Sequence, residues 1–320
     1  MALLEIDNLS IALAKGAARP ILDEISLTVD AGEVVGLVGE SGSGKSVACR
    51  TVLGLTPGNA KTGGEVRVGG DDVLGMDRAA LKQLRAKQVA MVFQDPRASV
   101  NPMRRVGDFL TEGMRAAGVS KEKAYARAEE LLTEVGIRDP KGALKRFPHQ
   151  FSGGMLQRVV IAAALTGDPS LLLADEPTTA LDVTTQAEVI GILRRLQAQH
   201  GTGMLFVTHD LELAAAICHR VYVMYAGRIV ETRTAEQLFA APRHPYTAGL
   251  LASTPSLEED AEPPRPIPGR PVSLAENPPG CAFAARCAFA EDRCRVETPV
   301  LKADDGGAVA CLRADEGILA

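Results

Sequence analysis

Apolar and polar positions alternate in short runs over the first third of the chain. Residues 3 to about 38 hold three strand-like runs, and the third is continuously apolar, as expected of a buried strand. The pattern then predicts a helix from Lys45 to about Leu55 and strands over Gly64–Val68 and Val89–Gln94. The first third of the sequence is therefore mainly a β-sheet region.

The middle of the chain has a different period. Residues 96–165 are predicted to be helical, because AYARAEELLTEVG repeats its apolar positions at the 3.6-residue spacing of a helix. From Leu171 the alternation of apolar strand and amphipathic helix returns and continues to about Gly227. Such alternation with a helical insert predicts an α/β core with mostly parallel strands.

The composition changes after about Pro255. Eight of the 19 prolines lie between Pro255 and Pro279, which predicts an extended, semi-rigid linker. Four of the six cysteines follow within the last forty residues. We therefore divide the sequence into a domain over residues 1–240 and a C-terminal extension over residues 241–320.

Net charge and hydropathy exclude several classes of protein. A formal net charge of −5 gives no basic footprint of a nucleic-acid binder, so we expect no nucleic-acid partner. The N-terminus lacks the basic start and apolar stretch of a signal peptide, and no apolar run approaches the roughly 18 residues needed to cross a bilayer. We expect a cytoplasmic protein that can dock on a membrane protein.

A glycine-rich segment, GESGSGKS, lies between the third strand and the first helix. It fits the phosphate-binding loop pattern G-x-x-x-x-G-K-[ST], whose glycines let backbone N–H groups turn towards phosphates. Lys45 is expected to reach the β- and γ-phosphates, and the Ser46 hydroxyl to bind Mg²⁺. An accidental glycine-rich turn is the alternative, against which the flanking strand and helix argue. The residues expected to bind ATP are Gly39, Ser41, Gly42, Gly44, Lys45 and Ser46.

The apolar run LLLAD ends in an acid, Asp175, and a second acid, Glu176, follows it. The carboxyl ends of strands are where α/β folds bind ligands. We expect Asp175 to hold Mg²⁺ through water and Glu176 to orient and activate the attacking water. A solvated acidic pair at a strand end is the plain alternative, and the phosphate loop in the same chain favours the catalytic interpretation.

The segment FSGGMLQR begins a predicted helix with Ser152, Gly153 and Gly154. A helix that starts in this way presents N–H donors and a positive dipole end to a phosphate, although an ordinary serine-capped helix start would look the same. Beside the phosphate loop, the segment resembles the LSGGQ signature of the ABC ATPase superfamily, from which Phe151 and Met155 depart. The resemblance implies that this segment contacts ATP held by a partner subunit.

Three further residues or segments follow in the order of that superfamily. Gln94 resembles the Q-loop glutamine that senses Mg²⁺ and touches the transmembrane partner, Ala180–Asp182 resembles the D-loop, and His209 resembles the switch histidine that contacts the γ-phosphate. Alone, they would be a turn glutamine, a helix cap and a strand-end histidine. The resemblance implies catalytic roles for Glu176, His209 and Gln94, and Mg²⁺ binding by Ser46, Gln94 and Asp175.

The C-terminal sequence narrows the resemblance. RHPYTAGLLASTPSL, IPGRP and GCAFAARC are similar to the C-terminal extension of oligopeptide, dipeptide and nickel importer ATPases. This implies a P-loop ABC ATPase domain with a RecA-like α/β core, an N-terminal antiparallel β-subdomain and a helical subdomain at about residues 96–165, followed by the small cysteine-containing extension. It also implies an ATP-hydrolysing subunit that energises uptake of di- or oligopeptides, with nickel chelates or another small solute as the alternative.

The four C-terminal cysteines are candidates for a metal site. Cys281, Cys287, Cys294 and Cys311 lie in a short segment of a chain expected in the cytosol, where structural disulfides are rare. The C-x2-C pairs usual for zinc are absent. Some peptide-importer ATPases carry an iron–sulfur cluster on a similar cysteine set, so we expect a [4Fe–4S] cluster, with Zn²⁺ or four unliganded thiols as alternatives.

The resemblance also implies partners. These are a second ATPase chain, expected to be non-identical, two transmembrane permease subunits, and an external solute-binding protein, with this chain peripheral on the cytoplasmic face of the inner membrane. A soluble ABC ATPase of DNA repair or translation is the main rival, but it usually has two ATPase halves or a long coiled-coil insertion. The SGG segment argues against a P-loop kinase or GTPase, and Glu176 and His209 argue against a non-hydrolysing regulatory subunit.

Overall fold

The computed structural model describes residues 2–13, 19–179, 181–254, 263–273, 276 and 278–319. These residues form two compact units. The helical unit comprises Asp30–Glu33 and Gly75–Leu205, and the phosphate-loop unit comprises Ala2–Val29, Val34–Leu74 and the chain from Phe206 onwards. Strand β8 (Gly203–Thr208) carries the chain from the first unit into the second.

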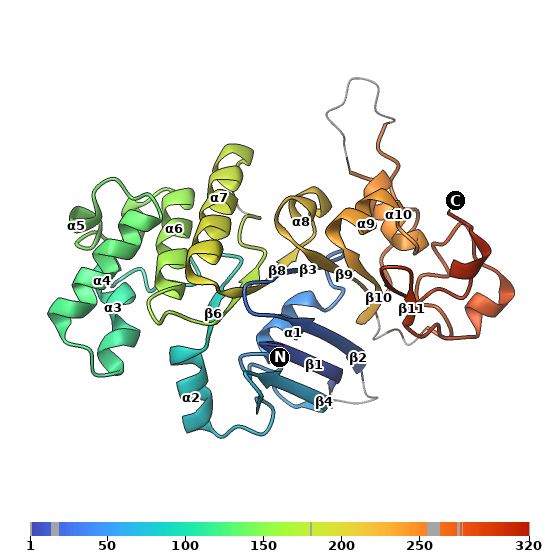
Figure 1. Cartoon of the computed structure of the whole chain (residues 1–320), viewed down its shortest axis with the longest axis horizontal. Helices are drawn as coiled ribbons and strands as arrows, with labels where there is room; N and C mark the ends of the chain where they lie inside the picture. Colours follow the sequence, from blue (N-terminus) through green and yellow to red (C-terminus); the bar gives the residue numbers. More distant parts are fainter. Residues whose placement is uncertain are drawn as a thin grey trace. The chain divides into compact units, whose positions relative to one another are not determined.

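Helices dominate the helical unit (Figure 1). Its remaining elements are α2 (Arg78–Lys87), β6 (Val89–Val92), α3 (Val106–Ala116), α4 (Lys121–Glu134), α5 (Pro140–Ala143), the 3-10 helix η1 (Pro148–Gln150), α6 (Gly153–Ala164), β7 (Leu171–Asp175) and α7 (Val183–His200). The helix predicted from the 3.6-residue period is α4, which buries Ala124, Ala128 and Leu131 on one face. Its first turn is capped by Ser120, whose hydroxyl accepts a hydrogen bond from the N–H of Lys123.

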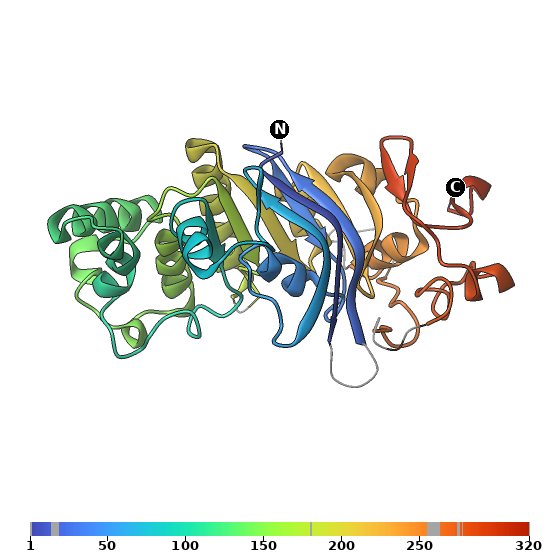
Figure 2. The same ribbon diagram turned by 90° about the horizontal axis from the view of Figure 1, so that it is seen from below.

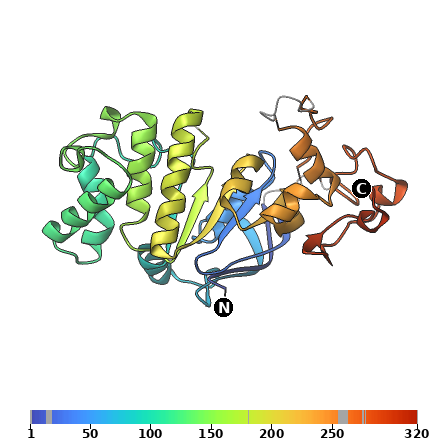
Figure 3. The same ribbon diagram turned by 45° about the horizontal axis from the view of Figure 1, so that its top comes forward.

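In the helical unit, a pair of strands and a pair of helices hold the segments in which site residues are expected. Strands β6 and β7 are parallel, with Val89 opposite Leu171, and all five residues of β7 are buried. Helices α6 and α7 lie side by side (Figure 3), joined by an ion pair of 2.5 Å between Arg158 and Glu188. The start of α6 and the end of β7 are therefore each held by regular structure. No helix in the described part of the chain is long and apolar enough to cross a bilayer.

The phosphate-loop unit contains an antiparallel sheet at its N-terminal end (Figure 2). The order of its strands is β2 (Arg19–Val29), β1 (Leu4–Leu13), β4 (Ala60–Val68) and β5 (Asp71–Asp72). Leu4 pairs with Val29 on one side and with Val68 on the other. The antiparallel β-subdomain expected from the sequence is thereby confirmed.

A second set of strands supports the phosphate loop itself. Strand β3 (Val34–Val38) is entirely buried and runs parallel to β9 (Arg220–Tyr225), as its continuous apolar run predicted. Antiparallel strands then follow outward from β9 in the order β10 (Arg228–Thr234), β12 (Gly307–Val309) and β11 (Lys302–Asp304). The last two strands come from the C-terminal extension, which therefore shares a sheet with the core strands.

The other elements of this unit are short. They are α1 (Lys45–Thr51), α8 (Leu211–Ile217), α9 (Ala235–Ala240), α10 (Pro245–Ala252) and the 3-10 helices η3 (Asp292–Arg295) and η4 (Ala314–Glu316). Helix α8 ends at Ile217, directly before the buried Cys218, whereas Cys49 is buried within α1. Within the proline-rich stretch, residues 263–273 contain no helix or strand.

Buried charges fix the start of the C-terminal extension. The fully buried carboxylate of Glu231 on β10 accepts hydrogen bonds from the N–H groups of Arg243 (2.7 Å) and His244 (2.9 Å). Arg233 pairs with Glu231 at 3.2 Å and also with Asp304 of β11. A buried charge is costly unless it is paired. Glu231 therefore holds the N–H groups of Arg243 and His244, and so fixes the position of the chain directly before α10.

Candidate functional site

The glycine-rich loop connects β3 to α1 in a conformation that requires glycine. Gly39 has φ +152° and Gly44 has φ +106°, both in a region that other residues rarely adopt. A Cβ atom on Gly44 would also lie only 2.6 Å from Cδ2 of Leu22. Ser41 and Gly42, at the tip of the loop, are exposed. The loop is thus folded tightly against the core while its tip faces solvent, as a phosphate-binding loop must be.

Lys45 is placed across this loop. It is the first residue of α1 and only 4% exposed, and its ammonium donates hydrogen bonds to the carbonyls of Gly39 (2.7 Å) and Glu40 (3.0 Å). Ser46 follows it on the same helix and is half-buried. A buried ammonium and a hydroxyl side by side are the groups that a phosphate and a divalent cation require.

His209 belongs to the same unit. It follows the last residue of β8 and its side chain is exposed. The next residue, Asp210, caps α8 by accepting a hydrogen bond of 3.0 Å from the N–H of Leu213. The cap ends the strand and holds the position of His209 between two regular elements.

The helical unit brings the glutamine and the second acid together. Asp175 is the last residue of β7 and only 1% exposed. Glu176 follows with φ +48°, an unusual conformation for a residue other than glycine and one often found at functional sites. Oε2 of Glu176 accepts a hydrogen bond of 3.0 Å from Nε2 of Gln94 and one of 2.8 Å from the hydroxyl of Thr179.

Thr179 is a residue that the sequence analysis missed. Its hydroxyl donates to the carboxylate of Glu176, and the N–H of Thr179 also points to the Glu176 carbonyl at 3.4 Å. The signal that could have found it is a hydroxyl three residues after an acid, where a tight turn brings the two side chains together. Glu176 is therefore oriented from two sides.

The signature segment begins α6 as an ordinary capped helix. The Ser152 hydroxyl accepts a hydrogen bond of 3.3 Å from the N–H of Met155. A Cβ atom on Gly154 would overlap the Cγ2 methyl of Thr185 on α7, whereas one on Gly153 would lie 3.9 Å from its nearest neighbour, Leu181. Gly154 therefore permits close packing of two helices, and Gly153 leaves the helix start uncovered.

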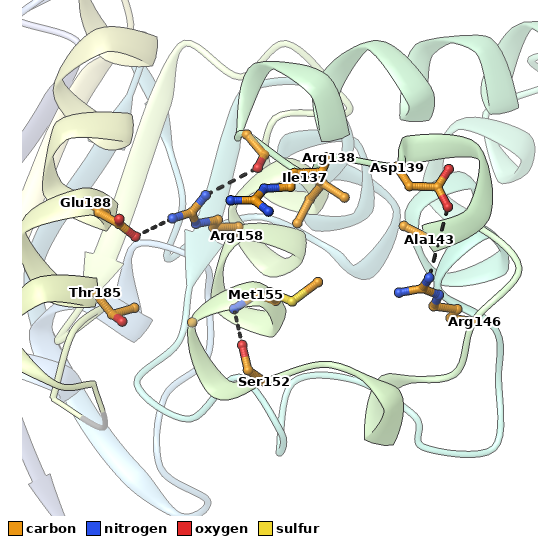
Figure 4. Close-up of a pocket in the computed structure, with 12 residues that line it drawn as sticks. Ile137, Arg138, Asp139, Ala143, Arg146, Ser152, Met155, Arg158, Thr185 and Glu188 are labelled. Carbon is orange, nitrogen blue, oxygen red and sulfur yellow. Dashed lines mark hydrogen bonds and ion pairs between the residues drawn. The ribbon is translucent and has the colours of Figure 1, made fainter.

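A cavity of about 480 Å³ opens beside this helix start (Figure 4). Ser152 and Met155 line it from α6, and Thr185 and Glu188 line it from α7. Three arginines, Arg138, Arg146 and Arg158, also line the cavity, and two acids, Asp139 and Glu188, pair with the last two of them, so that the lining is net positive by one charge. Positive charge beside the N-terminus of α6 suits an anionic ligand.

The described part of the D-loop lies at the start of α7. Asp182 caps this helix by accepting a hydrogen bond of 3.0 Å from the N–H of Thr185, and this bond lowers the pKa of the Asp182 carboxyl. Leu181 precedes it, and Ala180 lies outside the described residues. The segment has the helix-cap role that was its plain alternative, and its identification as a D-loop stays a prediction.

The four C-terminal cysteines line one small cavity of about 20 Å³. Burial raises the pKa of the Cys281 thiol to about 11 and also raises the pKa values of Cys287 and Cys311, so these thiols are neutral at pH 7. However, within the described residues no group of three or more acidic, histidine or cysteine side chains has the placement of a metal site. The geometry thus brings the four sulfurs to one place without supporting the expected iron–sulfur or zinc centre.

Comparisons with known proteins agree on one family. The model of the ABC transporter family matches residues 22–179, and that of the oligopeptide/dipeptide transporter C-terminal region matches residues 230–294. The chain is 45% identical to the dipeptide transport ATP-binding protein DppD of Escherichia coli, over 94% of this chain and 93% of that protein. It is also 45% identical to the oligopeptide transport ATP-binding protein OppD of Bacillus subtilis, over 95% and 86%.

Solved structures give the same answer for the fold. The chain is similar to cbiO1 from Clostridium perfringens, part of an ABC transporter complex, with a TM-score of 0.65, 25% identity, and coverage of 75% of this chain and 91% of that one. It is equally similar, at 0.65 and 26% identity over 72% and 98%, to a dimeric ATP-binding cassette bound to ADP and phosphate. This confirms the expected P-loop ABC ATPase fold. The chain belongs to the ABC transporter family, as one of the ATP-binding proteins that carry the oligopeptide/dipeptide transporter C-terminal region.

Proposed function

We propose that this chain is the ATP-hydrolysing subunit of an ABC importer of di- or oligopeptides. The chemical part of the proposal rests on one observation, the Glu176 carboxylate held by Gln94 and Thr179 at the end of β7. The transport part rests on the relatives, which are named as dipeptide and oligopeptide transport proteins and match almost the whole chain. Their names favour peptides over nickel chelates or other small solutes.

Each motif has a step in the proposed reaction. The N–H groups from Gly39 to Gly44 and the Lys45 ammonium bind the β- and γ-phosphates. Glu176 orients a water and accepts a proton from it as the water oxygen bonds to the γ-phosphorus. The bond from that phosphorus to the β–γ bridging oxygen breaks, and ADP leaves. His209 contacts the γ-phosphate. The residues proposed to bind ATP are Gly39, Ser41, Gly42, Gly44, Lys45 and Ser46 in this chain, and Ser152, Gly153 and Gly154 towards ATP of a partner.

Mg²⁺ is the cofactor that the family requires. A hydroxyl, an amide oxygen and a carboxylate suit it, and Ser46, Gln94 and Asp175 supply them. Asp175 is almost completely buried at its strand end, where a carboxylate is stabilised by a cation. When bound, Mg²⁺ would neutralise negative charge that develops on the phosphates during transfer.

The uncovered start of α6 supports the proposal of a second ATPase chain. Gly153 has no close neighbour, and the cavity beside it, lined by three arginines and two acids, offers a net positive charge to the phosphates of a nucleotide held by a second ATPase chain. A similar cassette is dimeric with ADP and phosphate bound. We propose a non-identical ATPase partner, two permease subunits and an external solute-binding protein, with this chain peripheral on the cytoplasmic face of the inner membrane.

Residues 1–240 would form the ATPase domain, with its helical subdomain at about 96–165, and residues 241–320 the C-terminal extension. In that extension we propose that Cys281, Cys287, Cys294 and Cys311 hold a [4Fe–4S] cluster or Zn²⁺. The shared cavity supports this, because all four cysteines line it, although the described residues are not placed as a metal site. Iron, sulfide and zinc analysis of protein purified without oxygen tests it, and a metal-free folded chain would rule it out.

Replacing Glu176 by glutamine tests the chemistry. We expect steady-state hydrolysis by the assembled complex to fall at least about 100-fold, because the water loses its base, while ATP affinity of the chain stays within about twofold. Phosphate release and nucleotide binding are the two measurements. Glu129→Gln, the same change at a solvent-accessible position on α4, is the control. Hydrolysis at the normal rate, in a complex whose partner chain has also lost its own catalytic acid, would contradict the assignment.

A further inference from the structure

The second residue of the phosphate loop is held by the C-terminal extension from two sides. The backbone N–H of Glu40 donates a hydrogen bond of 2.8 Å to the hydroxyl of Tyr246. Its carboxylate accepts two hydrogen bonds from the guanidinium of Arg286, at 2.6 and 3.0 Å. Both partners lie more than 200 residues further along the chain. The backbone and the side chain of one loop residue are thus both fixed by the extension.

Arg286 reaches the loop from a fixed position. It is 6% exposed, and its Nε donates a hydrogen bond of 2.9 Å to the carbonyl of Pro268. The guanidinium lies 5.8 Å from the ring centre of Tyr225 and 5.9 Å from that of Phe283. Because Nε is held by Pro268 and the guanidinium is planar, its two terminal nitrogens point in one direction. This gives the paired bonds to Glu40 their geometry.

Tyr246 is equally constrained. It is fully buried at the start of α10, and its ring packs against Tyr225 and Phe283 at 4.6 and 5.3 Å. The helix begins at this point because the His244 side chain accepts a hydrogen bond of 3.0 Å from the N–H of Tyr246. The position of the hydroxyl that accepts from the Glu40 N–H is therefore set by two ring contacts and by the cap at the start of α10.

The charge of Glu40 gives this arrangement a consequence for ligand binding. A carboxylate within a loop that binds phosphates repels them unless it is neutralised, since charges a few ångströms apart interact strongly where water is partly excluded. Glu40 is about a quarter exposed, and Arg286 is the cation that pairs with it. With the pair formed, the loop presents its N–H groups and Lys45 without an opposing charge.

We propose that Arg286 and Tyr246 are positioning residues for the phosphate loop, Arg286 by neutralising and orienting Glu40 and Tyr246 by holding its backbone. This rests on the proposed binding of ATP at the loop. The extension thereby acts on nucleotide affinity from within the same chain, and its two residues act through Glu40. Their removal should raise the KM for ATP and leave kcat nearly unchanged.

Arg286→Ala in the full chain is the first test. We expect ATP affinity to fall on the order of tenfold, because a carboxylate now stands unpaired beside the phosphates. The double change Arg286→Ala with Glu40→Gln should recover affinity to within about threefold of the unchanged protein, since no stray charge remains. Arg270→Ala, which breaks a paired contact with exposed Glu276 in the same region, is the matched control and should bind ATP normally.

Tyr246→Phe keeps the ring and removes the hydroxyl, so it tests the second contact without a large change in packing. We expect about a threefold loss of affinity, from a single hydrogen bond to a part of the loop that can still be solvated. Normal affinity in both Arg286→Ala and Tyr246→Phe would overturn the proposal, as would a double variant no better than Arg286→Ala. If Arg286→Ala does not fold, Tyr246→Phe decides alone. Failure of the unchanged chain to bind ATP would instead reject the proposed function.

Discussion

The phosphate loop and the signature segment are both glycine-rich and both expected to bind phosphate, yet they use glycine for different reasons. In the loop, Gly39 and Gly44 have positive φ values that other residues rarely adopt. In the signature, Gly153 and Gly154 begin an ordinary helix, and Gly154 is required because Thr185 lies against it. Glycine is therefore required by backbone conformation in the phosphate loop and by helix packing in the signature segment.

The two regions also differ in how they are supported. The phosphate loop is fastened by Tyr246 and Arg286, from the far end of the chain. The signature helix is fastened within its own unit, through the Ser152 cap and the ion pair between Arg158 and Glu188. Damage to the C-terminal extension should thus weaken the first region and spare the second.

Gly39→Ala should have the largest effect. The new Cβ would overlap the carbonyl oxygen of Met224 while φ is +152°, so neither the side chain nor the backbone has an easy escape. We expect the free energy of unfolding to fall by about 3 kcal/mol or more and ATP binding to be lost. Denaturant unfolding and nucleotide binding measure this. Gly42→Ala, with φ +82° but open surroundings, is the comparison and should cost about 1 kcal/mol. Equal losses of stability in Gly39→Ala and Gly42→Ala would show that overlap with the Met224 carbonyl plays no part.

Gly154→Ala tests the packing explanation in the signature. Overlap with the Thr185 methyl should lower the free energy of unfolding by about 2 kcal/mol. Adding Thr185→Ser removes that methyl and should restore most of the loss. Gly153→Ala, where the nearest atom is 3.9 Å away, should change stability by less than about 0.5 kcal/mol. If Thr185→Ser gives no recovery, close packing with α7 is not the reason for glycine at this position.

Mild acid should lower the free energy of unfolding of the phosphate-loop unit through His244, by less than Gly39→Ala or Gly154→Ala does. Burial lowers the pKa of His244 to about 4, against an ordinary value near 6.5, so the unfolded chain takes up the proton first as the pH falls. The stability that the neutral histidine contributes is complete above pH 6.5 and is lost between pH 6.5 and 4. Between pH 7.5 and 5.5 we expect a loss of about 1 kcal/mol that is absent in His244→Gln.

Denaturant unfolding at the two pH values provides the measurement. His149→Gln, an exposed histidine of the helical unit, is the control and should keep the full pH dependence. The same pH dependence in His244→Gln and in the unchanged chain would mean that another group is responsible. If the pH-dependent loss of stability disappears in His244→Gln but not in His149→Gln, acid weakens the support of the phosphate loop and not that of the signature.

Local pattern was sufficient for the elements whose cause is local. The buried strand and helix around GESGSGKS, the capped helix at Ser152 and the amphipathic α4 all lie where the sequence predicted them. The family was also evident from these motifs and their order. Each depends on backbone conformation, capping or periodicity, which neighbouring residues decide among themselves.

Contacts between distant residues could not be found in this way. Nothing in the sequence indicated that Gln94 donates a hydrogen bond to Glu176, that Thr185 makes Gly154 necessary, or that the extension adds two strands beside β10. The HPYT and AARC strings were recognised only as marks of a family. The tertiary structure decided their physical role, because packing alone brings Tyr246 and Arg286 onto Glu40 across more than 200 residues of chain.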